Sequence, residues 1–421
     1  MKKTALNLSK RAETVAESPI RKLFPYADAA KRAGRTVYHL NIGQPDIPTI
    51  PAMRAAYANV PEIVAYGPSQ GLPELCRKFA AYYAGYGIEV DEDQIYITNG
   101  GSEAIIFTLM AVTSHGDEVI VPEPYYANYN SFAGMAGATI VPVTTSLEEG
   151  FHLPDISEFE KKIGPKTRAI MFSNPGNPSG AVFSREKIGQ LVELAKQYNL
   201  YIISDEVYRE FTYGEKNAVS ILEFPGAEEN LIMVDSVSKR YSACGSRIGT
   251  IVSRNQDFLK LVLRFAQARL CPPTVDQMAV LAALDDTSDY LQDVREEYKA
   301  RRDFLYAQLI SIPGVKVSFP EGAFYLIAEL PVENAENFAV WMLKDFHLDG
   351  ETVMVAPAQG FYTTPGRGIR QVRIAYILTV KKLERSIRIL REGLEAYKVL
   401  KNSSADDSAK DMPDPDIRRV V

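Results

Sequence analysis

The sequence predicts an α/β protein with two parts: a large domain built on a mostly parallel seven-stranded sheet, and a smaller α/β domain. Seven short apolar runs rich in Ile and Val alternate with helical patterns, at residues 93–98, 118–121, 139–143, 168–173, 200–204, 231–234 and 249–252. Such runs between helices are typical of parallel strands buried on both faces. After about residue 285 the pattern changes to long charged helices at 290–310 and 380–400 and strands near 323–328 and 371–377. This change indicates the second domain.

Composition bounds the class of protein. With 421 residues and 46% hydrophobic content the chain can bury a large core. A formal net charge of −6 with interspersed signs argues against a nucleic-acid partner. No apolar run suits a signal peptide or a membrane span, and three scattered cysteines suggest neither a disulfide framework nor a metal site. We therefore expect a soluble cytoplasmic protein without metal, nucleic acid or membrane contact.

One lysine stands in a setting suited to covalent chemistry. Lys239 follows the apolar run 231–234 and two hydroxyls, Ser236 and Ser238, and Arg247 lies eight residues further on. An amine so placed can bind a carbonyl covalently while its neighbours hold a phosphate, which is what pyridoxal phosphate requires of a protein. Taken alone, a lysine between serines is more often a solvated loop residue.

The segment 236–249, SVSKRYSACGSRIG, resembles the lysine-attachment signature of the class I/II pyridoxal phosphate-dependent aminotransferases of fold type I. The resemblance extends from about residue 42 to 394 through NIGQPD, YGPSQG, GGSEA, SNPGNPSG, SDEVY and QVRIA, in the family's order. The sequence as a whole resembles most the bacterial aspartate aminotransferases of this family. This implies the aspartate aminotransferase-like fold, bound pyridoxal phosphate, and a homodimer with shared active sites.

The resemblance also implies a domain arrangement. Residues 47–289 would form the large cofactor-binding domain, and residues 21–46 would join 290–400 in the small domain. We expect residues 1–20 to form an N-terminal arm. The tail 401–421 is polar and acidic, so we expect it to be disordered.

The GGSEA turn joins a strand to a helix that we expect to begin near Ser102. Its glycines let the backbone approach a phosphate, and the free N–H groups of the helix start attract an anion. An ordinary serine N-cap is the alternative reading. Arg247 suits a phosphate clamp better than lysine would, with a structural salt bridge as its alternative. The residues that the resemblance assigns to the phosphate are Gly101, Ser102, Glu103, Ser236, Ser238, Arg247 and, from the neighbouring subunit, Tyr66. We expect Glu103 to use its backbone amide and to turn its carboxylate away.

Four residues match positions that touch the cofactor ring. Asp205 ends a buried strand, where it can keep the pyridine nitrogen protonated, although such an Asp is often only a cap or turn residue. The resemblance assigns the ring's phenolic oxygen to Tyr208 and Asn177, and stacking on the ring to Tyr126. Aromatic pairs are otherwise core or interface packing. The Asn177-Pro178 bond is a candidate for the cis form.

Arg373 lies in an apolar strand, where an unpaired charge is costly, so it needs an anionic partner. The resemblance assigns it to the substrate α-carboxylate together with Gly43 and Asn177. Arg370 is the competing choice, but its place before the strand suggests solvent.

The implied activity is amino-group transfer from an L-amino acid, with aspartate as first choice, to 2-oxoglutarate in a ping-pong cycle of amino acid metabolism. Lys239 would hold the cofactor as a Schiff base and, with Asp205 and Tyr208, form the catalytic group. A dicarboxylate needs a second cation, for which Arg21, Arg269 and Arg367 are candidates. The alternatives are an aromatic amino acid or alanine aminotransferase, a cofactor-dependent C–S lyase or cyclopropane-forming synthase, and a non-enzymatic regulator.

Overall fold

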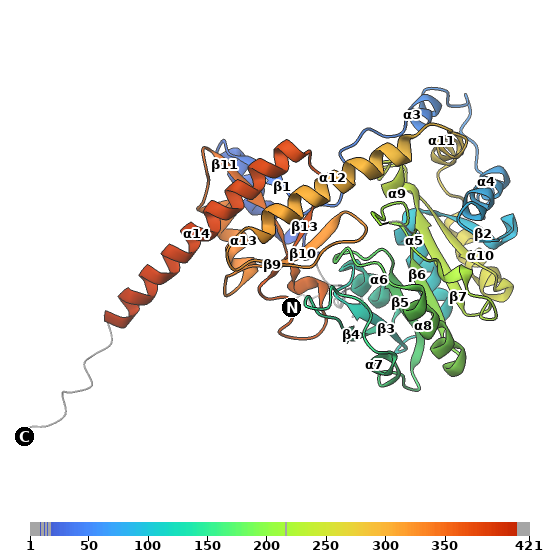
Figure 1. The fold of residues 1–421 in the computed structure, drawn as a ribbon. Coiled ribbons are helices and arrows are strands. Elements are labelled where there is room, and N and C mark those ends of the chain that lie inside the picture. Colours follow the sequence, from blue (N-terminus) through green and yellow to red (C-terminus); the bar gives the residue numbers. More distant parts are fainter. Residues whose placement is uncertain (1–8, 10–11, 13–14, 16–17, 215–216, 411–421) are drawn as a thin grey trace, which may run out of the picture.

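The computed structural model describes residues 9, 12, 15, 18–214 and 217–410, and its larger part is the expected seven-stranded sheet (Figure 1). The strand order is β2-β8-β7-β6-β5-β3-β4, and every neighbouring pair is parallel except those that include β8. The strands are β2 (Ile95–Asn99), β3 (Glu118–Glu123), β4 (Thr139–Thr144), β5 (Thr167–Ser173), β6 (Tyr201–Asp205), β7 (Leu231–Ser236) and β8 (Ile248–Ser253). Each strand begins and ends within two residues of its predicted run, so the predicted sheet is confirmed.

Helices cover both faces of this sheet, because alternate side chains of its strands are apolar in both directions. Leu231 and Met233 of β7 pack into one core cluster, whereas Ile232 and Val234 pack into another. The helices of this part are α3 (Pro51–Tyr57), α4 (Pro73–Ala84), η2 (Glu92–Gln94), α5 (Gly100–Val112), α6 (Asn128–Ala136), α7 (Ile156–Glu160), α8 (Arg185–Tyr198), η3 (Ile221–Glu223), α9 (Val237–Arg240), α10 (Gln256–Arg269) and α11 (Thr274–Leu284).

The smaller part contains a four-stranded sheet of order β12-β13-β10-β9 and a parallel pair, β1 with β11. Because β1 pairs with β11, the segment after residue 21 packs with the C-terminal third of the chain, and α2 also lies against α13 (Figure 1). The elements are η1 (Arg21–Leu23), α2 (Phe24–Arg32), β1 (Thr36–His39), α12 (Tyr290–Ile310), β9 (Lys316–Val317), β10 (Tyr325–Glu329), α13 (Ala335–Lys344), β11 (Glu351–Met354), β12 (Ala356–Pro357), η4 (Ala358–Phe361), β13 (Gln371–Ala375) and α14 (Val380–Lys410).

The C-terminal helix differs from its predicted length. We expected a helix over 380–400 and a disordered tail from 401, but α14 continues to Lys410 and projects from the body of the protein (Figure 1). No Pro or Gly lies between 401 and 410, so nothing in the local sequence ends the helix there. The rest of the tail, 411–421, and most of the expected N-terminal arm, 1–20, lie outside the described residues.

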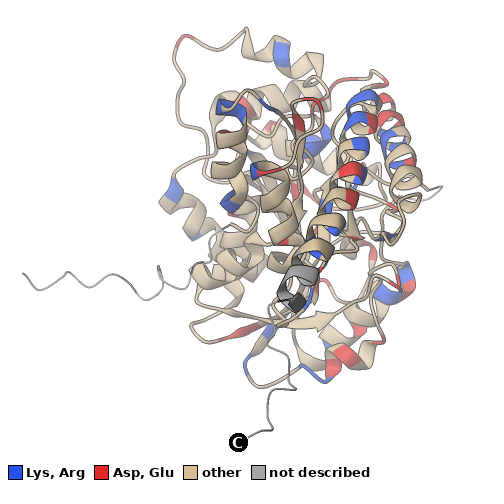
Figure 2. Ribbon diagram, turned by 90° about the vertical axis from the view of Figure 1, so that its left-hand side faces the viewer, with Lys and Arg blue, Asp and Glu red and all other residues tan. Residues whose placement is uncertain are grey.

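Charges of both signs are mixed over the outer helices, as Figure 2 shows for Lys and Arg beside Asp and Glu. This accords with the modest net charge of −6. Among the residues that the structure describes, no helix is long and apolar enough to cross a membrane.

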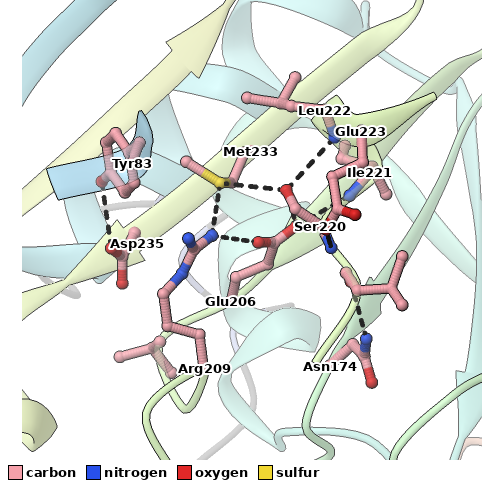
Figure 3. Close-up of polar contacts among 12 residues, drawn as sticks. Tyr83, Asn174, Glu206, Arg209, Ser220, Ile221, Leu222, Glu223, Met233 and Asp235 are labelled. Carbon is pink, nitrogen blue, oxygen red and sulfur yellow. Dashed lines mark hydrogen bonds and ion pairs between the residues drawn. The ribbon is translucent and has the colours of Figure 1, made fainter. Parts of the chain in front are cut away.

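A buried network of charges, which the sequence analysis did not predict, lies where β6 and β7 end (Figure 3). The Glu206 carboxylate pairs with Arg209 and accepts hydrogen bonds from the Ser220 hydroxyl at 3.0 Å and the Ile221 N–H at 3.2 Å. Asp235 pairs with Arg240, which is completely buried, and accepts a bond of 3.0 Å from the Tyr83 hydroxyl. The guanidinium of Arg209 lies 5.1 Å from the ring centre of Tyr83, so the two ion pairs form one network that connects the strand ends with α9.

Replacement of Arg240 by Met should strongly destabilise the protein, because it leaves Asp235 buried without its cation. We expect a loss of about 3–5 kcal/mol in the free energy of unfolding, measured by urea denaturation at fixed protein concentration. Arg185, which pairs with Glu223 and is 55% exposed, provides the control, and Arg185→Met should cost at most about 1 kcal/mol. Adding Asp235→Asn to Arg240→Met should recover part of the loss. Equal losses in the two single variants would contradict this interpretation.

Candidate active site

The candidate site lies at the carboxyl ends of three strands of the large sheet, because β2, β6 and β7 run in the same direction and all end on that side. Asp205 is the last residue of β6, and Ser236 is the last of β7. The short helix α9 then presents Lys239, and α5 begins at Gly100 directly after β2. The sheet thus brings together motifs that lie more than a hundred residues apart in the sequence.

Lys239 contacts the NIGQPD segment. Its Nζ atom donates a hydrogen bond of 3.0 Å to the carbonyl oxygen of Gly43, one of the predicted substrate residues. The Sγ atom of Cys244 lies 3.7 Å from the same amine. The lysine predicted as the catalytic residue therefore faces the segment predicted to bind substrate.

Arg247, Ser236 and Ser238 gather at the N-terminus of α5. The Oγ atoms of the two serines are 2.9 Å apart, and the guanidinium of Arg247 donates to Ser238 Oγ at 3.4 Å and to the Asn99 carbonyl at 3.4 Å. Gly100 has a φ of +75°, and a Cβ atom there would lie 2.2 Å from Nη2 of Arg247. Only glycine fits so close to the guanidinium. Hydroxyls, a guanidinium and a helix N-terminus together can hold a phosphate.

The carboxylate of Glu103 is occupied away from this cradle. It accepts hydrogen bonds from the N–H of Asn99 at 2.8 Å and from Arg269 at 3.0 Å. Arg269 also donates to the carbonyl of Ser69 at 2.9 Å. Of the three arginines considered for a second carboxylate, Arg269 thus already has an anionic partner.

Asp205 is held in a buried position by an aromatic cluster. Its Oδ2 atom accepts a hydrogen bond of 2.6 Å from Tyr129, and Tyr126 lies edge-on to the Tyr129 ring. Burial raises the pKa of Asp205 to about 6, although the bonds from Tyr129 and the Val207 N–H favour the charged form. Tyr129 was not among the predicted site residues; the only signal for it was an aromatic residue three positions after Tyr126, at the start of a helix.

The predicted distinction between Arg373 and Arg370 accords with their burial. Arg370 is 53% exposed, whereas Arg373 is only 2% exposed. The guanidinium of Arg373 donates to Asn177 Oδ1 at 3.1 Å and to the Asn41 carbonyl at 2.5 Å, and its Nε has no acceptor among the described residues. An uncompensated buried cation with a free N–H suits a carboxylate ligand. The Asn177-Pro178 bond is cis, as expected.

Tyr208 lies beside a residue that the sequence analysis also missed. Its hydroxyl is 2.9 Å from that of Tyr325, and burial raises the pKa of Tyr208 well above its usual value. Tyr325 gave no signal, because an aromatic residue in the apolar run AFYLIA is ordinarily core. Tyr66 is 82% exposed on a loop, and no contact in the described chain brings it to this site.

These residues fit pyridoxal phosphate. The phosphate matches the Arg247 cradle, the ring nitrogen matches the Asp205 carboxylate, and the carbonyl matches the Lys239 amine. The unfilled Nε of Arg373 leaves a donor for a substrate carboxylate. Within the described ranges, no group of three His, Cys, Asp or Glu side chains could hold a metal ion.

This sheet, with a lysine, an aspartate and a buried arginine brought together, suits an enzyme that acts on amino acids with bound pyridoxal phosphate. The family model "Aminotransferase class I and II" matches residues 35–390, so the chain belongs to that family of aminotransferases, whose members generally depend on pyridoxal phosphate.

Proteins similar to this chain are named for different amino acid substrates. The chain is 31% identical to an aspartate aminotransferase of Pyrococcus horikoshii, over 93% of this chain and 98% of the relative. It is also 31% identical to an aromatic-amino-acid aminotransferase of Thermococcus litoralis, over 93% of this chain and all of the relative. A solved structure of a double mutant of Thermus thermophilus aspartate aminotransferase superposes with a TM-score of 0.85 at 28% identity, covering 92% of this chain and 100% of that one.

The raised pKa of Asp205 predicts a gain in stability when its charge is removed. The pKa of this carboxyl is about 6 in the folded protein but about 4 in the unfolded chain. Its ionisation therefore destabilises the folded state increasingly between pH 4 and pH 6, and to the full extent above pH 6. Without added pyridoxal phosphate, the stability of Asp205→Asn relative to wild type should therefore rise by up to about 3 kcal/mol between pH 4 and pH 7. Urea denaturation at the two pH values measures it.

The control for this prediction is Asp257→Asn, because the Asp257 side chain is 91% exposed. It should show a much smaller change with pH. An Asp205→Asn variant whose relative stability is the same at both pH values would show that the carboxyl is not strained by burial.

Proposed function

We propose that this chain is a pyridoxal phosphate-dependent aminotransferase that moves the amino group of an L-amino acid, with aspartate as first choice, to 2-oxoglutarate. The observation that carries the proposal is the meeting of Lys239, Asp205, the Arg247 cradle and the buried Arg373 at one sheet edge. Membership of the family supports the same conclusion.

The protein's part in this chemistry begins with holding the cofactor. When bound, pyridoxal phosphate supplies an aldehyde carbon and a ring that accepts the electrons released at the substrate Cα. Arg247, the two serines and the backbone N–H groups of Gly101, Ser102 and Glu103 would bind its phosphate. Asp205, with a pKa of about 6, is mostly ionised at neutral pH and so would keep the ring nitrogen protonated.

The remaining residues would orient and deprotonate the substrate. Arg373, with Asn177 and the Gly43 backbone, would bind the α-carboxylate in a bidentate manner. Tyr208 and Asn177 would bond the ring's phenolic oxygen, and Tyr126 would stack on the ring. The free amine of Lys239 would carry the proton between the substrate Cα and the cofactor's exocyclic carbon, in each half of a ping-pong cycle.

A homodimer is part of this proposal. The loop that carries Tyr66 exposes Ile63 (79%) and Val64 (57%) as well as Tyr66 itself. Such an apolar loop is more readily explained by contact with a second subunit than by solvent. Tyr66 would then reach the phosphate of the neighbouring site.

Replacement of Lys239 by Ala should abolish the reaction. We expect the loss of the yellow absorbance band of the bound cofactor and a fall in kcat of at least about 10³-fold, because the amine acts both as covalent anchor and as general base. Lys260→Ala, at a position 70% exposed, is the matched control and should retain band and activity. Retention of normal transamination by Lys239→Ala would refute the proposed function.

The preference for aspartate needs a second cation, and of the three candidate arginines we propose Arg21. Arg269 is ion-paired with Glu103. Arg367 lines a cleft of about 430 Å³ together with Glu148, Glu329 and Glu333, and none of the residues proposed to bind cofactor or substrate lines that cleft.

Arg21 belongs to a segment that packs on Gly360, next to Phe361. Pro19 packs so closely on Gly360 that a Cβ there would fall 2.3 Å from it. The adjacent Phe361 lies 5.0 Å from the Arg373 guanidinium, and its carbonyl accepts from the N–H of Tyr125 at 3.0 Å. Burial raises the pKa of Tyr126 to about 12, and the charge of Arg21 is among those that oppose this rise.

Arg21→Met should therefore change the substrate preference. We expect kcat/KM for aspartate to fall roughly 10- to 100-fold, the effect of losing a hydrogen bond to a charged group, while kcat/KM for alanine and phenylalanine changes little. Half-reactions with aspartate, glutamate, alanine and phenylalanine measure it, with Arg367→Met as control. A wild-type preference for phenylalanine would instead favour the second candidate, an aromatic amino acid aminotransferase, which the aromatic rings of Tyr126, Tyr325 and Phe361 also suit.

A further inference from the structure

Tyr325, the first residue of β10, touches three parts of the candidate site although no motif includes it. It is 3% exposed, its hydroxyl lies 2.9 Å from that of Tyr208, and its ring lies 4.5 Å from the guanidinium carbon of Arg373. Its hydroxyl also fills the space beside Gly43, where a Cβ atom would fall 1.6 Å from the oxygen. Gly43 in turn accepts the hydrogen bond from Lys239.

We propose that Tyr325 is a positioning residue for the transamination reaction: its hydroxyl orients the proton of Tyr208 toward the cofactor, and its ring supports the guanidinium of Arg373. The inference rests on the proposed function and adds to it a residue that couples cofactor binding to carboxylate binding.

The hydrogen-bond inventory supports the role of the hydroxyl. Each tyrosine hydroxyl has one proton to donate and lone pairs to accept with. In the described part of the chain, the hydroxyl of Tyr325 has Tyr208 as its hydrogen-bond partner, so the satisfied arrangement has Tyr325 donate and Tyr208 accept. The proton of Tyr208 is then free for the ring oxygen of the cofactor, and a tyrosine that accepts a bond is a stronger donor itself.

The ring of Tyr325 acts on Arg373 by a different contact. Arg373 is buried, and its guanidinium carbon lies 4.5 Å from the centre of the Tyr325 ring. A guanidinium within about 6 Å of an aromatic centroid is attracted to the ring and is held in place by it. The hydroxyl and the ring thus make separable contributions.

Other charged and titratable groups surround the tyrosine pair and must be considered in any pH measurement. Asp205 and Arg373 act on Tyr208, Tyr126 and Arg373 lie near Tyr325, and the amine of Lys239 lies 6.0 Å from the ring centre of Phe324. Substitutions of Tyr325 leave all of these in place.

The experiment compares Tyr325→Phe with Tyr325→Leu. A hydrogen bond from Tyr208 to the ring oxygen would stabilise the deprotonated form of the bound cofactor. A weaker bond should therefore raise the pKa of the bound cofactor, which is measured from its absorbance band as the pH is varied. We expect Tyr325→Phe to raise this pKa by roughly half to one unit, the equivalent of one hydrogen bond. The second readout is the Kd of a non-reacting carboxylate, maleate or 3-phenylpropionate, whichever the wild type binds more tightly. This Kd should stay within about 2-fold in Tyr325→Phe but weaken about 5-fold in Tyr325→Leu, which loses the aromatic ring.

Tyr298→Phe is the matched control, because the ring of Tyr298 stacks on Phe324 while its buried hydroxyl has no hydrogen-bond partner among the described residues. It should leave both readouts unchanged. If Tyr325→Phe behaves like Tyr298→Phe in the band's pKa, Tyr325 only packs and the proposal is overturned. If wild-type protein shows no cofactor band at all, the proposed function fails instead, so the two failures are distinguishable.

Discussion

The ion pair between Asp235 and Arg240 lies wholly inside the protein, directly beneath the candidate site. It joins the end of β7 to the end of α9, five residues later, and Asp235 is fixed in addition by Tyr83 and by the N–H of Ser236. With both ends of this short segment held, Lys239 between them has little freedom to turn away. A buried ion pair is a weak source of stability, so its value here is better understood as positioning.

Two further buried charges, at the candidate site, lower the stability of the folded protein. Asp205 is forced to carry a charge in a buried position with Asp235 nearby, and both effects oppose its ionisation. Arg373 is buried with an unfilled donor. Ligands of opposite charge would relieve both costs: a protonated ring nitrogen at Asp205 and a carboxylate at Arg373. Binding of such ligands would therefore stabilise the folded protein, which is the usual relation between stability and function.

Much of this arrangement was predictable, because it depends on local patterns. Apolar runs gave the strands, and the place of Arg373 within an apolar strand distinguished it from Arg370. What sequence reasoning missed was contact between distant segments. Tyr83, Glu206 and Asp235 form one network only after three elements pack, and Tyr325 meets Tyr208 across 117 residues. The end of α14 was missed for the opposite reason, since polar composition was taken for disorder where no helix breaker was present.

In the proposed function, reaction type and substrate choice depend on different parts of the chain. The groups proposed for the chemistry are Asp205, at the end of β6, and Lys239, in the short helix that follows β7, where packing leaves them little freedom. The group proposed for aspartate, Arg21, is exposed in a short segment whose Pro19 packs on Gly360. A change in that segment can alter which side chain fits without disturbing the sheet edge. Such a separation accords with the names of two relatives that are equally similar to the chain, one an aspartate and the other an aromatic-amino-acid aminotransferase.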